Sequence, residues 1–278
     1  MSIAEFLSFA FVQRALIAGA LIAATTAALG VFLVLKRLSL IGDSLSHVAL
    51  SGVALGLITK ASPVFVAVPV VMGSALLILK IKKHARVYTD GALGIVSALG
   101  ISAGLIIAAL AGGFNADLMS FLFGGILTVS RAELLLAAAL AAAAAGIIYI
   151  FYNDLTALVF DENFARAAGV DTEKTETILV LISAAAVVVA MKVVGIMLVS
   201  AMIIIPPSAA LLLAADFKRA VMLACAFSVC AVLLGIYFAF LLNLPAGAVI
   251  IIINILILIF CSAVRKYVIK KRTSARID

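Results

Sequence analysis

Residues 39–56 read SLIGDSLSHVALSGVALG, an apolar stretch that contains one carboxylate and one imidazole, those of Asp43 and His47. On a helix, side chains four residues apart lie on the same face, with Cβ atoms roughly 6 Å from each other. An ionisable group in membrane hydrocarbon costs roughly 2.5–3.5 kcal/mol on insertion scales, so such groups usually face a partner or a water-filled path. The presence of Asp43 and His47 in this stretch therefore needs an explanation.

The pair has two interpretations. As metal ligands, a carboxylate oxygen and a neutral imidazole nitrogen suit zinc, manganese or iron. As structural groups, the two side chains would form a hydrogen-bonded pair that holds two helices together. Alternatively, Asp43, which stands between Gly42 and Ser44 in the sequence, would cap the N-terminus of a helix. The D-x-x-x-H spacing alone does not decide between these interpretations.

The composition indicates a membrane protein. Of the 278 residues, 67% are hydrophobic and 12% are charged, and the mean hydropathy is +1.36. This is more apolar surface than a soluble domain of this size can bury, so we expect an all-α, polytopic transmembrane helical bundle. Because no linker or soluble second domain interrupts the apolar runs, we expect residues 1–278 to form a single transmembrane domain.

The apolar runs predict nine crossings, or eight if one run enters the membrane only halfway, since a span takes about 20 mostly apolar residues. The predicted spans are residues 14–35, 42–59, 63–81, 91–112, 132–152, 220–242 and 246–264, with two more in 177–214 that turn near Lys192 and kink or break at Pro206-Pro207. Residues 115–128 are too short for an ordinary crossing, which favours a re-entrant or interfacial segment.

Basic residues assign the cytoplasmic side of the bundle. They gather at Lys80–Arg86 and in a tail of about residues 265–278. If these segments, Lys36-Arg37, the polar loop 153–176 and the 216–219 turn all face the cytoplasm, the spans alternate consistently and the N-terminus lies outside. The net charge of +7 then reflects the excess of basic residues on the cytoplasmic side, where anionic lipid headgroups balance it. No nucleic-acid partner is expected.

The polar loop contains the sequence FDENFARAAGV, which predicts a short helix outside the spans. Asp161 or Asn163 would lie near its start, and Gly169 would end it. The loop is the longest polar segment of the chain.

The chain resembles the metal-ion permease family of ABC transporters, the membrane subunits of bacterial zinc and manganese importers. The resemblance depends on the segments KRLSLIGDSLSHVALSGVALG, LMSFLFGGILTVS, DENFARAAGV, KVVGIMLVSAMIIIPPSAALLLA and LPAGAVIIIIN, which occur in this order. They cover most of the chain, and the D-x-x-S-H block is specific. The chain departs from the family pattern at Ser51, where many members have proline, and at Pro206-Pro207, where a single proline is more usual.

The resemblance implies roles for two sets of residues. Asp43 and His47 match the family's transmembrane metal-contacting pair. The helix around Phe160–Val170 resembles the cytoplasmic coupling element that docks in a groove of the ATP-hydrolysing subunit, and an ordinary surface helix is the alternative. The residues expected to couple the chain to the ATPase are Asp161, Glu162, Phe164, Ala165, Arg166 and Gly169.

The resemblance also implies partners. The chain contains no G-x-x-x-x-G-K-[ST] phosphate-binding loop, so it is not expected to be an enzyme, and a separate ATP-binding cassette subunit would hydrolyse ATP. The expected assembly is a homodimer of this chain with two ATPase subunits and an extracytoplasmic metal-binding protein, in a bacterial or archaeal cell membrane. No cofactor is expected to stay bound. The transported ion would be divalent, zinc first and manganese next, and would move by alternating access.

Two other classes of transporter stay open. An ion-coupled secondary metal carrier would use Asp43 as its proton site and would need no ATPase; such carriers often contain internal repeats, which are not evident here. An ABC permease for a metal chelate or a vitamin would share the spans and the coupling loop without needing an Asp/His pair. A membrane-embedded enzyme is disfavoured because the sequence has no nucleophile/base pair and no H-E-x-x-H site.

Overall fold

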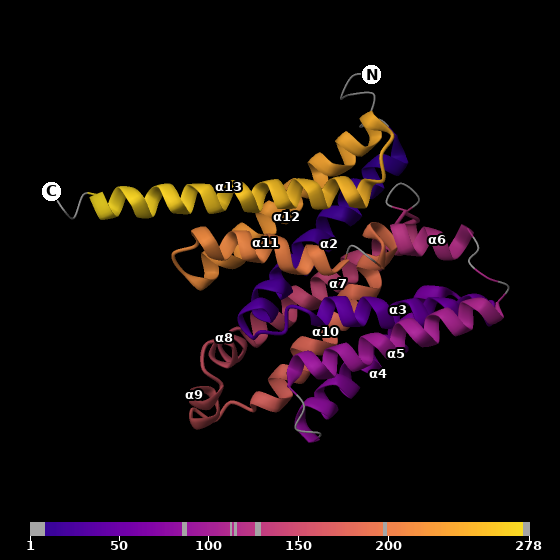
Figure 1. Cartoon of the computed structure of the whole chain (residues 1–278), viewed down its shortest axis with the longest axis horizontal. Helices are drawn as coiled ribbons and strands as arrows, with labels where there is room; N and C mark the ends of the chain where they lie inside the picture. Colours follow the sequence, from indigo (N-terminus) through magenta and orange to yellow (C-terminus); the bar gives the residue numbers. More distant parts are fainter. Residues whose placement is uncertain are drawn as a thin grey trace.

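The computed structural model describes residues 9–84, 88–111, 113, 116–125, 129–196 and 199–274. In these ranges all regular elements are helices (Figure 1). Eight of the helices are long and apolar enough to cross a membrane. The predicted all-α transmembrane bundle is therefore confirmed.

The predicted spans correspond to the observed helices with small shifts at their ends. The long helices are α2 (Ala10–Leu35), α3 (Ile41–Ile58), α4 (Pro63–His84), α5 (Thr89–Leu110), α7 (Arg131–Ile150), α10 (Thr172–Val194), α12 (Phe217–Leu242) and α13 (Ala246–Ser274). The shorter helices are α6 (Ala116–Phe123), α8 (Tyr152–Phe160), α9 (Glu162–Ala167) and α11 (Val199–Leu213). The ninth predicted crossing corresponds to α11, which is apolar and has 15 residues.

Three helices form the centre of the bundle. In α2, α3 and α10, 67–72% of the span residues are buried, whereas the other spans are 17–33% buried. Helix α2 contacts α7, α10, α11 and α12, and α3 packs against α4 and α5. Figure 1 shows α2 crossing the bundle obliquely before the chain turns into α3. The helix that contains Asp43 and His47 is thus one of the most enclosed elements.

The predicted turn near Lys192 is confirmed, because α10 ends at Val194 and is followed by Gly195, whose φ is 98°. The predicted break at the two prolines is wrong, because α11 continues through Pro206 and Pro207. Pro207 has no N–H to donate to the carbonyl of Ile203 four residues earlier. The backbone of Gly30 in α2 packs directly against this carbonyl. The two prolines thus lie inside α11, at the place where α2 packs most closely against it.

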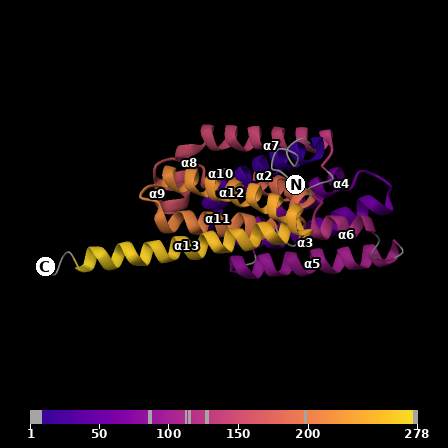
Figure 2. The ribbon, with the colours of Figure 1, turned by 90° about the horizontal axis from the view of Figure 1, so that it is seen from above.

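The boundaries of two further helices differ from the prediction. Helix α10 begins at Thr172, five residues before the predicted span, because the Asp171 side chain accepts the backbone N–H of Lys174 at 3.0 Å. Helix α13 continues beyond residue 264 to Ser274, since no glycine or proline interrupts it. Much of the predicted basic tail is therefore helical. Figure 2 shows this end of α13 projecting beyond the other helices.

Some expectations fall on residues that the structure does not describe. In the predicted short segment, α6 has eight residues, too few to cross a membrane, and residues 114–115 and 126–128 lie outside the described ranges. Arg86 and residues 275–278 of the tail also lie outside them.

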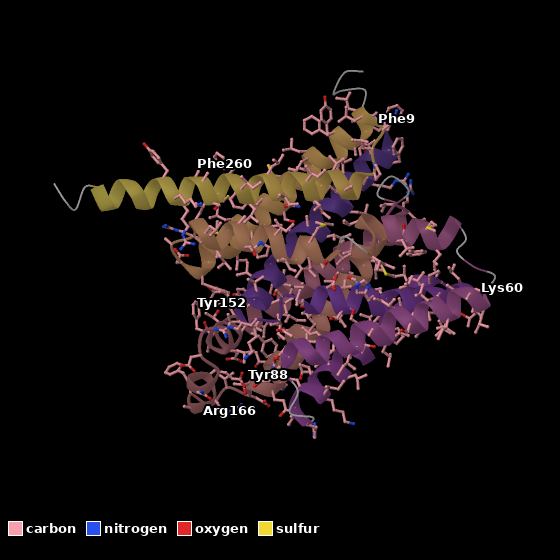
Figure 3. The ribbon with its side chains drawn as sticks, in the orientation of Figure 1. Phe9, Lys60, Tyr88, Tyr152, Arg166 and Phe260 are labelled. Atoms are coloured by element: carbon pink, nitrogen blue, oxygen red, sulfur yellow. The ribbon has the colours of Figure 1, made fainter. Side chains whose placement is uncertain are left out.

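The segments assigned to the cytoplasm share one end of the bundle, which we call the polar end. It comprises the ends of α2 and α4, helices α8 and α9, and the beginnings of α10 and α12. Ion pairs join Lys36 to Glu162 and Lys83 to Glu173 across it. In Figure 3, Tyr88, Tyr152 and Arg166 lie toward this end, while Phe9 and Lys60 lie toward the opposite one.

The contact between Gly30 and α11 predicts a loss of stability on substitution. A Cβ at position 30 would overlap the carbonyl oxygen of Ile203 and lie 2.7 Å from Cγ of Pro207. We expect Gly30→Ala to destabilise the fold by about 1–3 kcal/mol, the usual effect of overpacking a core. The measurement is the midpoint of thermal unfolding of the purified chain in detergent.

Gly146→Ala in α7 is the matched control, because a Cβ at position 146 would have no atom within 4 Å. That variant should unfold at the wild-type temperature or above it, since alanine is the better helix former. An unchanged midpoint for Gly30→Ala would contradict the described contact between α2 and α11.

Candidate functional site

The structure places Asp43 and His47 together near the beginning of α3. Oδ2 of Asp43 lies 3.5 Å from Nε2 of His47. The helix begins at Ile41 after Leu40, which makes no side-chain cap bond, so the interpretation of Asp43 as the N-terminal cap is wrong. Nor is either side chain hydrogen-bonded to another helix within the described residues. The pair is therefore a local, same-face pair on α3.

Both side chains are accessible although α3 is largely buried. The exposed fraction is 49% for the Asp43 side chain and 29% for that of His47. The neighbouring serines are turned into their own helix, where Ser46 Oγ donates to the carbonyl of Gly42 at 2.6 Å and Ser44 Oγ to that of Leu40 at 3.3 Å. The polar atoms on the open side of this turn are thus those of the carboxylate and the imidazole.

A metal ion at this position would have two ligands from one chain. In the part of the chain that the structure describes, three or more His, Cys, Asp or Glu side chains nowhere come close enough to hold an ion. The remaining coordination positions would be filled by water or by groups from another chain. An open, two-ligand site of this kind differs from the closed four-ligand sites in which zinc has a structural role.

The second predicted site, the short helix α9, is defined by its cap. Oδ1 of Asp161 accepts the backbone N–H of Asn163 at 2.9 Å and that of Phe164 at 3.0 Å. Asp161 and not Asn163 is therefore the residue that starts the helix. After the helix the chain reverses at Gly169, whose φ of 87° lies in the left-handed region that favours glycine. The sequence predicted both ends of this helix.

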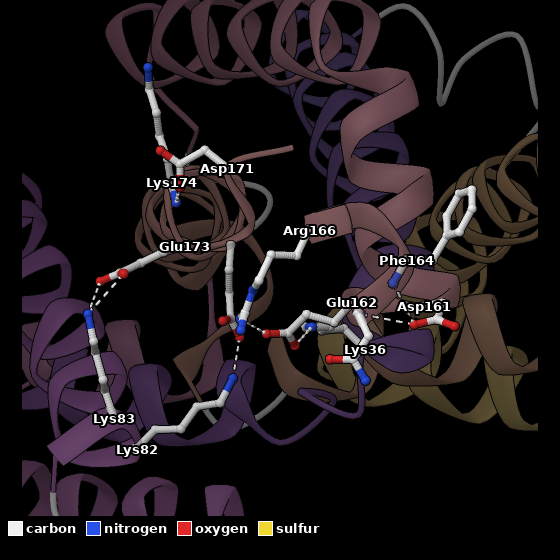
Figure 4. A network of polar contacts seen from close by, with 12 residues as sticks. Lys36, Lys82, Lys83, Asp161, Glu162, Phe164, Arg166, Asp171, Glu173 and Lys174 are labelled. Atoms are coloured by element: carbon white, nitrogen blue, oxygen red, sulfur yellow. Dashed lines mark hydrogen bonds and ion pairs between the residues drawn. The ribbon is translucent and has the colours of Figure 1, made fainter. Parts of the chain in front are cut away.

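Helix α9 has an inner and an outer face. Ala165 is fully buried against the bundle, and Glu162 is directed toward Lys36 at the end of α2. Phe164 points outward and is 67% exposed. Arg166 is equally exposed but lies on the same face as Glu162, with which it pairs (Figure 4). An exposed phenylalanine on a short capped helix is typical of a surface that contacts another protein.

Helix α8, which the sequence did not predict, attaches this segment to the spans through aromatic rings. The ring of Phe217 at the start of α12 lies 5.0 Å from Phe32 of α2, 6.0 Å from Tyr152 and 5.9 Å from Phe160. The edge-to-face and tilted arrangements fall in the range that aromatic pairs prefer. The end of α2 and both ends of α8 therefore meet at one residue of α12.

Glu162 is the centre of an ionic network. Its Oε2 accepts a hydrogen bond from Nζ of Lys36 at 2.6 Å, and its Oε1 accepts one from Nη2 of Arg166 at 3.1 Å. The hydrogen bond from Lys36 holds the pKa of Glu162 below its ordinary value; burial acts in the opposite direction, and the charges of Lys36, Lys82 and Arg166 lower it further. Glu162 is therefore ionised at neutral pH.

Sequence reasoning missed the role of Lys36. It assigned Lys36 only to the cytoplasmic side, because the partner Glu162 is 126 positions away. No local spacing relates the two residues, so only the folded chain brings them together.

Comparison with known proteins places the chain in a family. It matches the ABC 3 transport family over residues 8–265. It is 32% identical over 249 residues to the manganese transport system membrane protein MntC of Halalkalibacterium halodurans, which covers 90% of this chain and 85% of that protein. It is 27% identical over 175 residues to the high-affinity zinc uptake system membrane protein ZnuB of Haemophilus influenzae, 63% of this chain and 67% of that one.

A solved structure agrees with this placement. A chain of PsaBC from Streptococcus pneumoniae in complex with Fab superposes with a TM-score of 0.84 at 31% identity, covering 94% of this chain and 95% of that one. Because the sequence match and the superposition each extend over most of the chain, this multi-pass membrane protein belongs to the ABC 3 transport family.

Proposed function

We propose that the chain is the membrane-spanning permease subunit of an ABC importer that moves a divalent transition-metal ion across a bacterial inner membrane. The 3.5 Å approach of Asp43 to His47 on an enclosed helix is the observation that supports this proposal best. The similar proteins are named for manganese transport and for zinc uptake. Both ions accept one carboxylate oxygen and one imidazole nitrogen.

Zinc is the first candidate and manganese the second. The affinity of a nitrogen and oxygen site for divalent metal ions rises from manganese to copper, and such a site binds zinc more tightly than manganese. Relatives named for manganese and for zinc both align with this chain, so the ligand pair alone does not select one ion. A selective transporter would then draw its selectivity from the protein that delivers the ion.

The transport site would form between two copies of the chain. Asp43 and His47 stay 49% and 29% exposed in one copy, so a second copy can supply further ligands from the same residues. Conduction needs a site that binds well enough for the ion to enter and weakly enough for it to leave. A few protein ligands with exchangeable water meet this requirement, and alternating access would open the site first outward and then inward.

Energy would come from a separate ATP-binding cassette subunit, because the sequence contains no phosphate-binding loop of its own. The outer face of α9, with Phe164, would dock on that subunit at the polar end, which is then cytoplasmic. An extracytoplasmic binding protein would deliver the ion at the opposite end. No permanently bound cofactor is part of this proposal.

The first test is metal uptake into proteoliposomes that contain this chain, its ATPase and its binding protein. We expect the double variant Asp43→Asn/His47→Ala to reduce ATP-driven uptake of zinc or manganese at least ten-fold, because the ion loses both of its protein ligands. His84→Ala is the matched control, since His84 is exposed at the end of α4 and bonds only the carbonyl of Lys80 within the described residues. Its uptake should equal that of the wild type.

Uptake that survives in the double variant would remove Asp43 and His47 from the pathway. If the wild type transports neither ion but transports a metal chelate or a vitamin, the chain is an ABC permease for that larger substrate and the present proposal is wrong. Metal uptake without any ATPase would instead identify a secondary carrier.

The second test is the affinity of the chain for its ATPase in detergent. Truncation of an exposed aromatic anchor commonly costs about 2 kcal/mol or more at a protein interface, so we expect Phe164→Ala to weaken binding at least ten-fold. Phe260→Ala is the matched control, because Phe260 on α13 is 68% exposed, almost as much as Phe164, but lies within an apolar span. Equal ATPase affinity of the wild type and Phe164→Ala would place the docking surface elsewhere.

A further inference from the structure

Lys36 is a cation that the fold encloses. Its side chain is only 9% exposed, whereas that of its partner Glu162 is 42% exposed. The ammonium lies 2.6 Å from Oε2 of Glu162, and Figure 4 shows this contact together with the bond from Arg166 to the same carboxylate. Removing the carboxylate from an enclosed ammonium leaves an unpaired charge, which is strongly unfavourable. The pair therefore resists separation.

The turn that follows Lys36 is rigid. The backbone N–H of Arg37 donates to the carbonyl of Val34 at 3.1 Å, and that of Leu38 to the carbonyl of Leu33 at 2.8 Å. Arg37 has a φ of 61°, a left-handed conformation that a residue other than glycine keeps only where the surrounding structure fixes it. The side chain of Leu38 is buried. A displacement of Lys36 is thus transmitted along the backbone.

The same turn leads directly into the helix of the metal-ligand pair. The N–H of Ile41, the first residue of α3, donates to the carbonyl of Leu38 at 3.0 Å. Asp43 follows two residues later. Lys36 and Asp43 are therefore connected by a short segment that is hydrogen-bonded at both of its ends.

Two further ion pairs at the polar end join α4 to α10 and do not involve this turn. Lys82 bonds Glu176 at 2.5 Å, and Lys83 bonds Glu173 at 2.7 Å. Lys83 and Glu173 are 58% and 71% exposed, so water can solvate both when they separate. Among the ion pairs of the described residues, the one from Lys36 to Glu162 joins α9 to the α2–α3 turn.

We propose that the Lys36–Glu162 ion pair, which we call the latch, makes the α2–α3 turn follow the movement of α9. The inference rests on the proposed function, in which α9 docks on the ATPase. When the ATPase displaces α9, the turn and the first residues of α3 move with it, because separating the latch would leave the Lys36 ammonium enclosed without a partner. Lys36 is thus a positioning residue that acts on Asp43 and His47 through the backbone.

The test measures metal uptake and ATP hydrolysis in the same proteoliposomes, with wild-type ATPase and binding protein. Lys36→Met and Lys36→Gln each remove the cation of the latch without leaving an enclosed ammonium unpaired, and both leave α9, the helix that is proposed to dock on the ATPase, unchanged in sequence. We expect both variants to assemble and to hydrolyse ATP, and to move at least ten-fold less metal per ATP hydrolysed. The conservative variant Lys36→Arg keeps the cation and should stay within two-fold of the wild type.

Lys83→Met is the matched control, because it removes an ion pair at the same end that does not reach the turn. Its ratio of metal to ATP should equal that of the wild type. A wild-type ratio in Lys36→Met or Lys36→Gln would overturn the latch, and so would an equal loss in Lys83→Met. Should Lys36→Met fail to assemble, Lys36→Gln decides, because its uncharged polar side chain can lie beside the Glu162 carboxylate.

A spectroscopic arm separates the latch from the proposed function. A nitroxide is attached at position 40 by Leu40→Cys, in a background whose three native cysteines are replaced by alanine; Leu40 is 49% exposed. In the assembled complex, trapping the ATPase with nucleotide and vanadate should change the mobility of the label, and Lys36→Met should abolish the change. This result would support the latch even if the wild type transported no metal, and an equal response in Lys36→Met would overturn it.

Discussion

The close approach of α2 to α11 is the contact on which the rest of the arrangement depends. Pro207 leaves the carbonyl of Ile203 without its helical donor, and Gly30 presents backbone where any side chain would collide with it. Helix α2 can therefore cross the centre of the bundle and contact α7, α10, α11 and α12. Its far end then determines where Lys36 and the beginning of α3 lie.

The sequence predicted what depends on composition and local spacing. The apolar runs located the spans, the four-residue spacing brought Asp43 and His47 to one face, and Asp161 with Gly169 marked the ends of α9. It did not predict that α11 continues through Pro206-Pro207, because the local rule for proline was overridden by packing against α2. The pairing of Lys36 with Glu162 was not predictable either, since periodicity in one sequence does not tell which distant segments become neighbours.

The two proposed sites differ in their chemistry. At the start of α3, an accessible carboxylate and imidazole would suit an ion that must bind and leave. At the polar end, the enclosed Lys36 ammonium and a group of edge-to-face and tilted rings attach α8 and α9 to α2 and α12. In the proposed mechanism, weak binding of the ion and firm attachment of α9 are both needed for movement outside the membrane to change access within it.

The continuous α13 has a consequence for how the protein sits in lipid. Its apolar part, residues 246–264, is about 28 Å long at a rise of 1.5 Å per residue, close to the hydrocarbon thickness of about 30 Å. Arg265 and Lys266 directly follow in the same helix and so fall at the headgroup layer. A thicker bilayer would draw these cations toward hydrocarbon and a thinner one would favour a tilt of α13, so the apolar length of this helix matches the protein to one range of bilayer thickness.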